Sequence, residues 1–404
     1  MVFVGCDWSR EKHDVCVMDG QGNVLARRRI EHSAEGFTEL QEMLAGFEDD
    51  PSQVCMGLEF HTGALLAWLL EQGYTVHGIN PKSASRFRER YRPAGEKDDE
   101  WDARVLADAV RTDAHRLHRI EPQSDATEEL RESVELRRTL IKERTRHINR
   151  LRSLLSEWCP ALNALCHDFT RRWVMDLLAE FPLHEDLAAA HGNRINRIMK
   201  KHHLHPPTRE GVREVRAKEP LFIPESHKMP LRREIRFLAD QIANLSDHLG
   251  QLDGELQGLV EAHPDAPIFQ SLPGAGTTTV ASFLAAFGED REASPSWRQL
   301  AAFWGVAPLT KQSGKHRSVH HRWTCRPGMK QTLTLFAFQT ASTDGCWARE
   351  YYQEKRKRNA EHYTALRCLA QRWVKIIYRM WQDRSTYAED THATNRARRA
   401  ASAP

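Results

Sequence analysis

A stripe of apolar residues through the middle of the chain limits the possible folds more than any other feature. Nine residues follow one another at alternating steps of four and three positions: Leu231, Ile235, Leu238, Ile242, Leu245, Leu249, Leu252, Leu256 and Leu259. This unbroken alternation favours a coiled coil, although a core helix of one globular domain has the same period. Because the stripe must be covered, the sequence predicts a partner helix, either from the same chain or from a second subunit.

The first 125 residues have the pattern of a mixed α/β domain. Apolar strands are expected at 2–7, 15–19 and 24–30, with a glycine-rich turn at 20–23 joining the last two. Two more buried strands, 54–60 and 75–81, are separated by a helix that Gly73 ends, and a further helix runs from about Asp99 to Asp113. Strands followed by alternating strands and helices predict a mixed sheet, and the strand–hairpin–strand order is that of a ribonuclease H-like sheet.

The rest of the chain is predicted to be helical. The expected helices lie at 130–158, in a variable insert at 185–228, along the apolar stripe, and near 277–286, 297–304, 330 onwards and 361–382. The predicted domains are a catalytic domain at 1–125, a basic helix, insert and coiled coil at 126–262, a mainly helical domain at 263–384, and a disordered tail at 385–404.

The charge of the chain is unevenly distributed. Residues 96–102 hold five acids in seven positions, whereas residues 293–343 contain seven Lys and Arg and no acid. The first region suits metal ions and the second suits phosphates. Charges interrupt every apolar run, no signal peptide is visible, and none of the eight cysteines forms a Cys-x-x-Cys pair. We therefore expect a cytoplasmic protein with reduced thiols and no membrane partner.

Four carboxylates form the first candidate site. Asp7 ends the first strand, Glu59 lies near the end of another buried strand, and Asp99 and Asp102 share one face of a helix. Asp98 is four residues from Asp102 and fits the place of Asp99 equally well. Acids at the ends of buried strands need a positive partner, and Mg²⁺ prefers oxygen ligands. The acids therefore predict a Mg²⁺ site, although each alone is also an ordinary surface charge.

Basic and glycine-rich segments predict contacts with nucleic acid. Gly274 and Gly276 belong to a Pro-Gly-Ala-Gly turn before a helix, which resembles a helix–hairpin–helix element that binds phosphate through backbone N–H groups. Basic side chains add candidate phosphate contacts; they are Arg137, Arg138, Arg144, Arg146, Arg150, Lys311, Lys315, Arg317, Arg322 and Arg326. A plain interhelical turn and solvated helix faces are the alternatives.

A serine lies in the middle of the basic stretch 305–323. Ser313 precedes Gly314, and Lys311, Lys315, His316 and Arg317 surround it. Nearby cations favour the alkoxide and hold a phosphodiester, so Ser313 is a candidate nucleophile. No carboxylate is close in sequence, so a Ser-His-Asp triad is not readable, and a loop that only contacts phosphate is the alternative.

Two groups of motifs resemble one family. GCDWSREKHDVCV, GLEFHTGALLAWLL, INPKSASRF and KDDEWDARVLADAV resemble, in that order, the RuvC-like domain of the DEDD transposases of bacterial insertion sequences, the insertion-sequence-one-ten (IS110) family. LPGAG, SWRQLAAFWGVAP and the Ser-Gly pair resemble the transposase domain of the same family. The family has Thr where this chain has Asp98, so Asp99 and Asp102 take the third and fourth acid positions.

The resemblance implies a function and its partners. It implies a recombinase in which Ser313 attacks a DNA phosphodiester to form a covalent phosphoserine link, while Asp7, Glu59, Asp99 and Asp102 hold Mg²⁺ nearby. It also implies guidance by a structured bridge RNA and association with the bacterial nucleoid. The coiled coil predicts a homo-oligomer, either a dimer or a tetramer. A Mg²⁺-dependent junction nuclease without serine chemistry and a non-catalytic, dimeric nucleic-acid-binding protein remain the alternatives.

Overall fold

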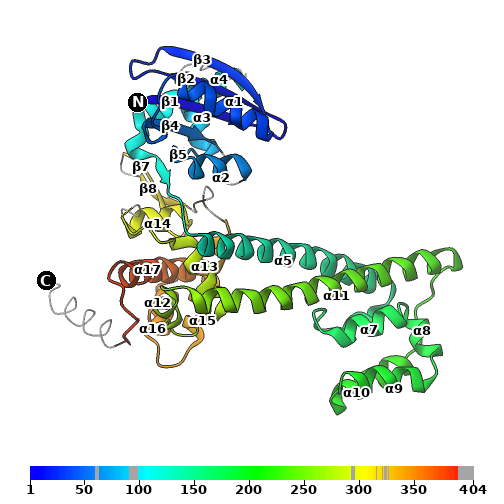
Figure 1. The fold of residues 1–404 in the computed structure, drawn as a ribbon. Coiled ribbons are helices and arrows are strands. Elements are labelled where there is room, and N and C mark those ends of the chain that lie inside the picture. The colour runs from blue at the N-terminus through cyan, green and yellow to red at the C-terminus, as the bar shows by residue number, and fades with distance from the viewer. Residues whose placement is uncertain are drawn as a thin grey trace. The chain divides into compact units, whose positions relative to one another are not determined.

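A computed structural model gives the fold of the chain (Figure 1). It describes residues 1–59, 63–90, 99–292, 296–314, 316–320, 322, 325 and 327–389, without the side chains of Asp99, Glu100, His118 and Arg317. The chain divides into two compact units. The sheet unit comprises Met1–Ser124 and Gly288–Arg326, and the helical unit comprises Asp125–Phe287 and Pro327–Pro404. The sequence had assigned 288–326 to the same domain as the helices that flank it.

The sheet unit contains a mixed six-stranded sheet. Its strands are β1 (Val2–Trp8), β2 (Lys12–Met18), β3 (Val24–Glu31), β4 (Val54–Leu58), β5 (Thr75–Gly78) and β6 (His118–Ile120). They lie in the order β3-β2-β1-β4-β5-β6. The pairs β1–β4 and β4–β5 are parallel, and the other neighbours are antiparallel. The predicted mixed sheet is confirmed, and β6 is a strand that the sequence did not predict.

Helices cover both faces of this sheet. The helices of this unit are α1 (Ala34–Ala45), α2 (Ala64–Glu71), α3 (Pro81–Glu89), α4 (Asp99–Asp113) and α14 (Trp297–Phe303), with 3-10 turns at Pro51–Gln53 and Ala114–Arg116. On one face Leu40 of α1 and Leu69 of α2 share a core with Val4. On the other face Ala84 of α3 and Val110 of α4 share a core with Cys55. The sheet is therefore the middle layer of three.

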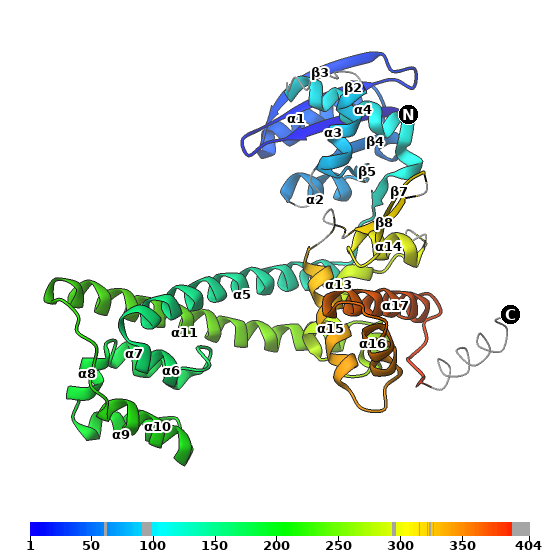
Figure 2. The same cartoon turned by 180° about the vertical axis from the view of Figure 1, so that it is seen from behind.

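Two long antiparallel helices form the frame of the helical unit (Figure 2). They are α5 (Asp125–Trp158) and α11 (Glu225–Ala262). Arg137 bonds to Asp253 and Arg150 to Glu234, so the residue number falls along α11 as it rises along α5. Most of the apolar stripe is buried, Leu245 and Leu259 only partly. A helix of the same chain, one of the two predicted alternatives, therefore covers much of the stripe.

Shorter helices surround the two ends of this pair. Between α5 and α11 the chain forms α6 (Pro160–Leu165), α7 (Arg172–Glu180), α8 (His184–Ala189), α9 (Gly192–Lys201) and α10 (Pro206–Ala217). After α11 follow α12 (Ala266–Gln270), α13 (Thr277–Phe287), α15 (Pro327–Ser342), α16 (Trp347–Lys357) and α17 (His362–Gln382). The predicted core face of α17 is confirmed, because Trp373 and Trp381 are buried and the Trp373 indole donates to Thr340 Oγ1 at 2.9 Å.

Residues just after α17 also hold to this unit. The Tyr387 backbone N–H donates to Ser271 Oγ at 2.8 Å, and the Trp347 indole donates to the Tyr387 hydroxyl at 2.9 Å. Burial and the neighbouring Glu389 raise the pKa of Tyr387. These contacts order the chain as far as Glu389, beyond residue 385, where the sequence predicted disorder to begin.

The basic stretch that the sequence predicted as a loop is a β-hairpin. Strand β7 (Leu309–Ser313) pairs with β8 (His316–His320), and Ser313 lies opposite His316. Gly314 has φ +55°. A two-residue hairpin turn requires a positive φ at its first central position, and glycine adopts it without strain. The loop prediction was wrong because the strands of this exposed ribbon lack the alternation of apolar and polar residues that marks a half-buried strand.

Two expectations about the chain as a whole can be compared with the described part. Six of the eight cysteines are buried, and all eight are free thiols. Burial and the charges of Asp7 and Asp14 raise the pKa of the Cys6 thiol. No helix in the described segments is long and apolar enough to cross a membrane.

Candidate active site

Two of the predicted acids lie side by side at one edge of the sheet. Asp7 belongs to β1, Glu59 directly follows β4, and the residues before them, Cys6 and Leu58, are register partners. Both acids are partly buried. Because neighbouring parallel strands in register turn equivalent residues to the same face, the two carboxylates face the same side of the sheet. The sequence prediction that strand ends bring Asp7 and Glu59 together is therefore supported by the strand register.

Glycines on both strands bring α4 against that side. A Cβ atom on Gly5 would lie 1.9 Å from the Ala103 carbonyl oxygen, and one on Gly57 would lie 2.9 Å from the Leu106 carbonyl oxygen. Asp7 is two residues after Gly5, and Glu59 is two residues after Gly57, so both acids face α4. Along β1, Asp7 lies two residues, or roughly 7 Å, beyond Gly5. Gly5 contacts Ala103 of α4, and Asp102 directly precedes Ala103. The first turn of α4, with Asp99 and Asp102, therefore lies near Asp7.

Asp102 is already paired with an arginine. It is 4% exposed, and it accepts from Arg88 Nε at 2.5 Å and from the second terminal nitrogen of Arg88 at 2.7 Å. Arg88 comes from α3. The guanidinium neutralises a buried carboxylate that would otherwise be costly. The sequence analysis did not single out Arg88, because its partner lies on another helix and no local spacing connects the two.

The arrangement fits Mg²⁺ only if Asp102 changes partner. The acids supply the hard oxygen ligands that Mg²⁺ prefers. Within the described segments, however, no three metal-binding side chains converge, and the side chain of Asp99 and the whole of Asp98 lie outside them. Arg88 occupies both oxygens of Asp102. Asp7 and Glu59 would thus form the first part of a metal site, and Asp102 would join it after releasing Arg88.

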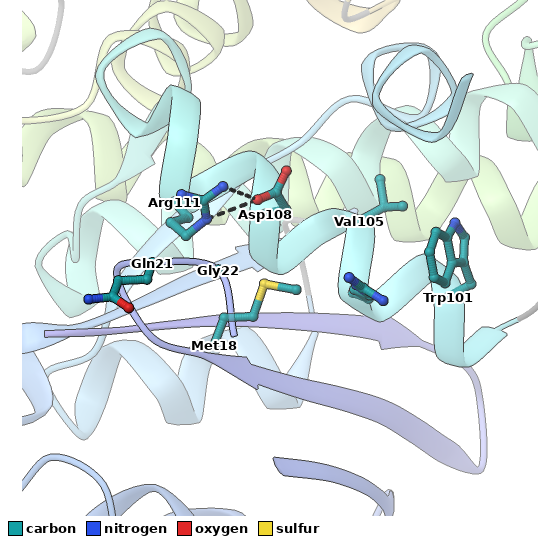
Figure 3. A pocket seen from close by; sticks show the side chains of 8 residues that line it. Met18, Gln21, Gly22, Trp101, Val105, Asp108 and Arg111 are labelled. Atoms are coloured by element: carbon teal, nitrogen blue, oxygen red, sulfur yellow. Dashed lines mark hydrogen bonds and ion pairs between the residues drawn. The ribbon is translucent and has the colours of Figure 1, made fainter. Parts of the chain in front are cut away.

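A hollow of about 190 Å³ lies on the other flank of α4 (Figure 3). Trp101 lines it, and the Arg104 guanidinium stacks 4.8 Å from the centre of the Trp101 ring. Asp108 and Arg111 form an ion pair further along the helix, with Nε–Oδ1 at 2.9 Å. Trp101 thus lies one residue from Asp102 but contributes to a different surface of α4.

Two histidines pack against each other near the end of β1. His13 of β2 is fully buried, and its Nε2 lies 2.9 Å from Nδ1 of His32. His13 is the register partner of Trp8, and the two rings stack. Burial, reinforced by His32, lowers the pKa of His13 to about 4. His13 is therefore uncharged at neutral pH, and it supports the end of β1 next to Asp7.

Ser313 is exposed at the end of β7. Its hydroxyl makes no hydrogen bond to another described residue, and the described residues around it in the hairpin include no Asp or Glu. A second serine of the hairpin is better placed for activation by a base, since Ser318 Oγ lies 2.8 Å from Nε2 of His320. Lys311 is exposed on the same ribbon, opposite Ser318. The sequence analysis overlooked Ser318, although the Ser-Val-His spacing on a strand places both side chains on one face.

The other predicted phosphate contacts have varied surroundings. Gly274 has φ +71°, and its carbonyl accepts from Gln339 Nε2 at 2.5 Å. A Cβ atom on Gly276 would meet open space. The turn leads into α13, which begins at Thr277, as predicted. The backbone of Arg322 accepts from Cys325 Sγ at 3.9 Å. Lys315, Arg326 and the side chain of Arg317 lie outside the described residues.

The arginines of α5 are largely engaged within the chain. Arg137 binds Asp253, Arg144 donates to Ser246 Oγ at 3.3 Å, and Arg150 binds Glu234 at 2.5 Å. The other two predicted contacts, Arg138 and Arg146, pair with glutamates three residues earlier on α5. Three of the five therefore fasten α5 to α11, a role that the sequence analysis did not consider. Arg146 and Arg150 stay mostly exposed, with 74% and 64% of their side-chain surfaces accessible.

Comparison with known proteins places the chain in one family. A family model for DEDD transposases of the IS110 type matches residues 4–160, and one for transposases of the IS116/IS110/IS902 family matches residues 266–353. The mini-circle protein of IS117 from Streptomyces coelicolor, provisionally named its transposase, is 28% identical over 96% of this chain and 95% of its own length.

Two further relatives agree with this placement. A protein of Sinorhizobium fredii, also provisionally named a transposase, is 34% identical, and the match spans 50% of this chain and 57% of that relative. The transposase for insertion sequence element IS1111A of Coxiella burnetii is 22% identical over 77% of this chain and 70% of its own length. The chain belongs to the IS110 family of DEDD transposases, enzymes that cleave and rejoin DNA strands.

Proposed function

We propose that this transposase cuts and rejoins DNA through a covalent link to Ser313, beside a Mg²⁺ site built on a RuvC-like, ribonuclease H-like sheet. The observation that carries the proposal is the shared register of Asp7 and Glu59 on two adjacent parallel strands, both facing the helix that bears Asp99 and Asp102. The strand order supports the same fold. The antiparallel strands β2 and β3 lie on one side of β1, and the parallel strands β4 and β5 lie on the other.

The serine chemistry proceeds in two steps. Ser313 Oγ attacks the phosphorus of a DNA phosphodiester and its proton passes to a base or to water. The bond from phosphorus to the leaving deoxyribose oxygen breaks, and that oxygen takes up a proton. A hydroxyl of another DNA strand then attacks the phosphoserine, which rejoins the DNA and returns the proton to Ser313. Mg²⁺, when bound, offsets negative charge on the phosphate oxygens.

Each of the four acids has a proposed role. Asp7 and Glu59 would hold the metal ion from the ends of β1 and β4, and Asp99 would hold it from the first turn of α4. Asp102 becomes a ligand only when Arg88 releases it, because both its oxygens accept from the guanidinium. Lys311 and its basic neighbours hold the phosphodiester near Ser313, in the strand of the hairpin that precedes the turn.

The proposal includes partners that follow from the resemblance to the family. A structured bridge RNA pairs with the element and the target, and subunits assemble as dimers or tetramers, with the long helices α5 and α11 as the coiled-coil contact. The exposed Arg146 and Arg150 supply backbone contacts for nucleic acid. RNA that copurifies with the protein, and whose loops match the ends of the element, would support the guide. Purified protein that is active without RNA would contradict it.

A comparison of two variants distinguishes the proposal from a metal nuclease. In a Mg²⁺-dependent assay on DNA that carries an end of the element, Asp7→Asn and Ser313→Ala should each abolish strand exchange. A junction nuclease without serine chemistry would lose activity in Asp7→Asn and keep it in Ser313→Ala. Ser318→Ala is the matched control, since Ser318 lies on the same hairpin. Membership of a transposase family leaves the non-catalytic alternative without support.

A further inference from the structure

Helix α9 in the insert between α5 and α11 has one apolar and one polar face. Ile195, Ile198 and Met199 are buried and anchor the helix to the core of the helical unit. Asn193, Asn196, Arg197 and Lys200 are exposed. Steps of three and four residues place these four side chains on a single face, directed away from the core. The fold thus presents a polar helix surface for which the DEDD chemistry gives no role.

The charges on this face are arranged in two layers. Glu180 of α7 accepts from Arg194 at 2.9 Å and from Arg197 at 3.0 Å, and its side chain is only 18% exposed. The two arginines are 55% and 70% exposed. Asp176, 20% exposed, binds Lys201, which is 63% exposed, in the same way. The carboxylates therefore lie at the base and the cations at the rim, where an approaching molecule meets positive charge.

The cations outnumber the acids that hold them. Glu180 holds Arg194 and Arg197, and Asp176 holds Lys201 together with Arg172 and His202. Lys200 has no acidic partner among the described residues. Asn193, Asn196, Arg197, Lys200 and Lys201 also line a hollow of about 440 Å³. A helix face with excess positive charge, whose basic side chains are held by carboxylates behind them, fits a polyanion.

We propose that the exposed face of α9 binds duplex DNA in its major groove. The basic side chains contact phosphates on both sides of the groove, and Asn193 and Asn196 reach base edges, because asparagine amides pair with adenine in that groove. An α-helix fits the major groove of B-form DNA, whereas the major groove of duplex RNA is too narrow for one. The inference rests on the chain acting on DNA and does not depend on the chemistry of Ser313.

Binding of the full-length protein to a DNA duplex of about 30 base pairs tests the proposed role of the basic side chains. Mg²⁺ is left out of the assay so that binding is measured without the proposed strand cleavage. In the triple variant Arg197→Ala, Lys200→Ala, Lys201→Ala the slope of log K against log salt should fall by about 2 to 3, and affinity at physiological salt should fall at least tenfold. Arg379→Ala is the control, since Arg379 is 82% exposed and ion-paired on α17.

The proposed base contacts of Asn193 and Asn196 are tested by comparing the binding of two DNA sequences. Asn193→Ala with Asn196→Ala should leave the salt slope unchanged and reduce by roughly tenfold the preference for the element end over scrambled DNA. All five substituted side chains are exposed, so thermal unfolding should match the wild type.

Two outcomes would overturn the proposal. One is wild-type DNA affinity and salt slope in the triple variant. The other is a loss confined to duplex RNA of the same sequence, which would assign the face to RNA. If these variants bind DNA normally while Ser313 still forms its covalent link, the inference fails and the proposed function stands. If the link is absent while DNA binding falls as described, the serine mechanism fails and the DNA-binding face stands.

Discussion

Single residues decide how closely the acids of this transposase approach one another. Gly5 and Gly57 are register partners, and each lies under α4. Arg88 fixes Asp102 from the neighbouring helix. The sequence identified Asp7, Glu59 and the acids of α4 because strand ends and helix spacing are local signals. It did not identify Arg88 or the two glycines, because their roles depend on contacts between segments far apart along the chain.

Substitution of Gly5 tests the close contact of α4. In Gly5→Ala the new methyl group would meet backbone atoms of Ala103 and Ala107, which cannot move without shifting the helix. We expect a loss of about 2–3 kcal/mol in the free energy of unfolding, and faster hydrogen exchange in α4. Gly20→Ala is the control, since a Cβ there meets nothing within 4 Å. Equal stability of the two variants would show that α4 does not lie on Gly5.

Substitution of Arg88 tests the metal role of Asp102. Arg88→Ala leaves a buried carboxylate unpaired and should cost about 3–5 kcal/mol of stability without metal. If Asp102 is a ligand, Mg²⁺ should restore more of the melting temperature in this variant than in the wild type. Arg86→Ala, an exposed neighbour on α3, should behave like the wild type. A deficit in Arg88→Ala that is independent of Mg²⁺ would make the pair purely structural.

At the scale of elements, those with a clear hydrophobic period were predictable. The periods of β1 to β3, α4, α5, α11 and α17 and the short apolar runs of β4 and β5 indicated these elements, and the structure contains them. The hairpin β7–β8 was not predicted, because its strands are exposed on both faces and lack apolar alternation. β6 was missed because it has only three residues, paired to β5 at the sheet edge.

Buried His13, in the strand next to Asp7, should make the free energy of unfolding depend on pH. Folding lowers the pKa of His13 to about 4 from an unfolded value near 6.5, so the unfolded chain binds more protons between these values. Stability is therefore complete above about pH 6.5 and falls by on the order of 2 to 3 kcal/mol as pH drops towards 4. His13→Phe should flatten this part of a plot of melting temperature against pH, and His115→Gln, an exposed control, should not. A dependence unchanged in His13→Phe would assign it to other groups.

The pairing of α5 with α11 predicts how the apolar stripe contributes to stability. Ile242 is fully buried within one chain, so Ile242→Ala should cost about 2–5 kcal/mol at every protein concentration. Leu245→Ala, at a partly exposed position of the same stripe, should cost less. Thermal unfolding over a hundredfold range of concentration measures both. A loss in Ile242→Ala that changes with concentration would show that a second subunit covers this part of the stripe.

At the scale of the whole molecule, the sequence predicted the boundary near residue 125 but not how later segments are grouped. The structure places 288–326, with Ser313, in the same unit as the sheet, while the helices on either side belong to the other unit. Grouping of distant segments depends on tertiary contacts that leave no local pattern. Serine and acids therefore belong to one unit of the fold, which supports an active site that uses both.

The most direct test is to map the covalent DNA link. The protein is incubated with Mg²⁺ and DNA that carries an element end, then digested, and the DNA-bearing peptide is identified by mass spectrometry. The account predicts a nucleotide on Ser313, absent in Ser313→Ala, strongly reduced in Asp7→Asn and unchanged in Ser318→Ala. A link to Ser318 or to any other residue, or strand exchange that persists in Ser313→Ala, would contradict it.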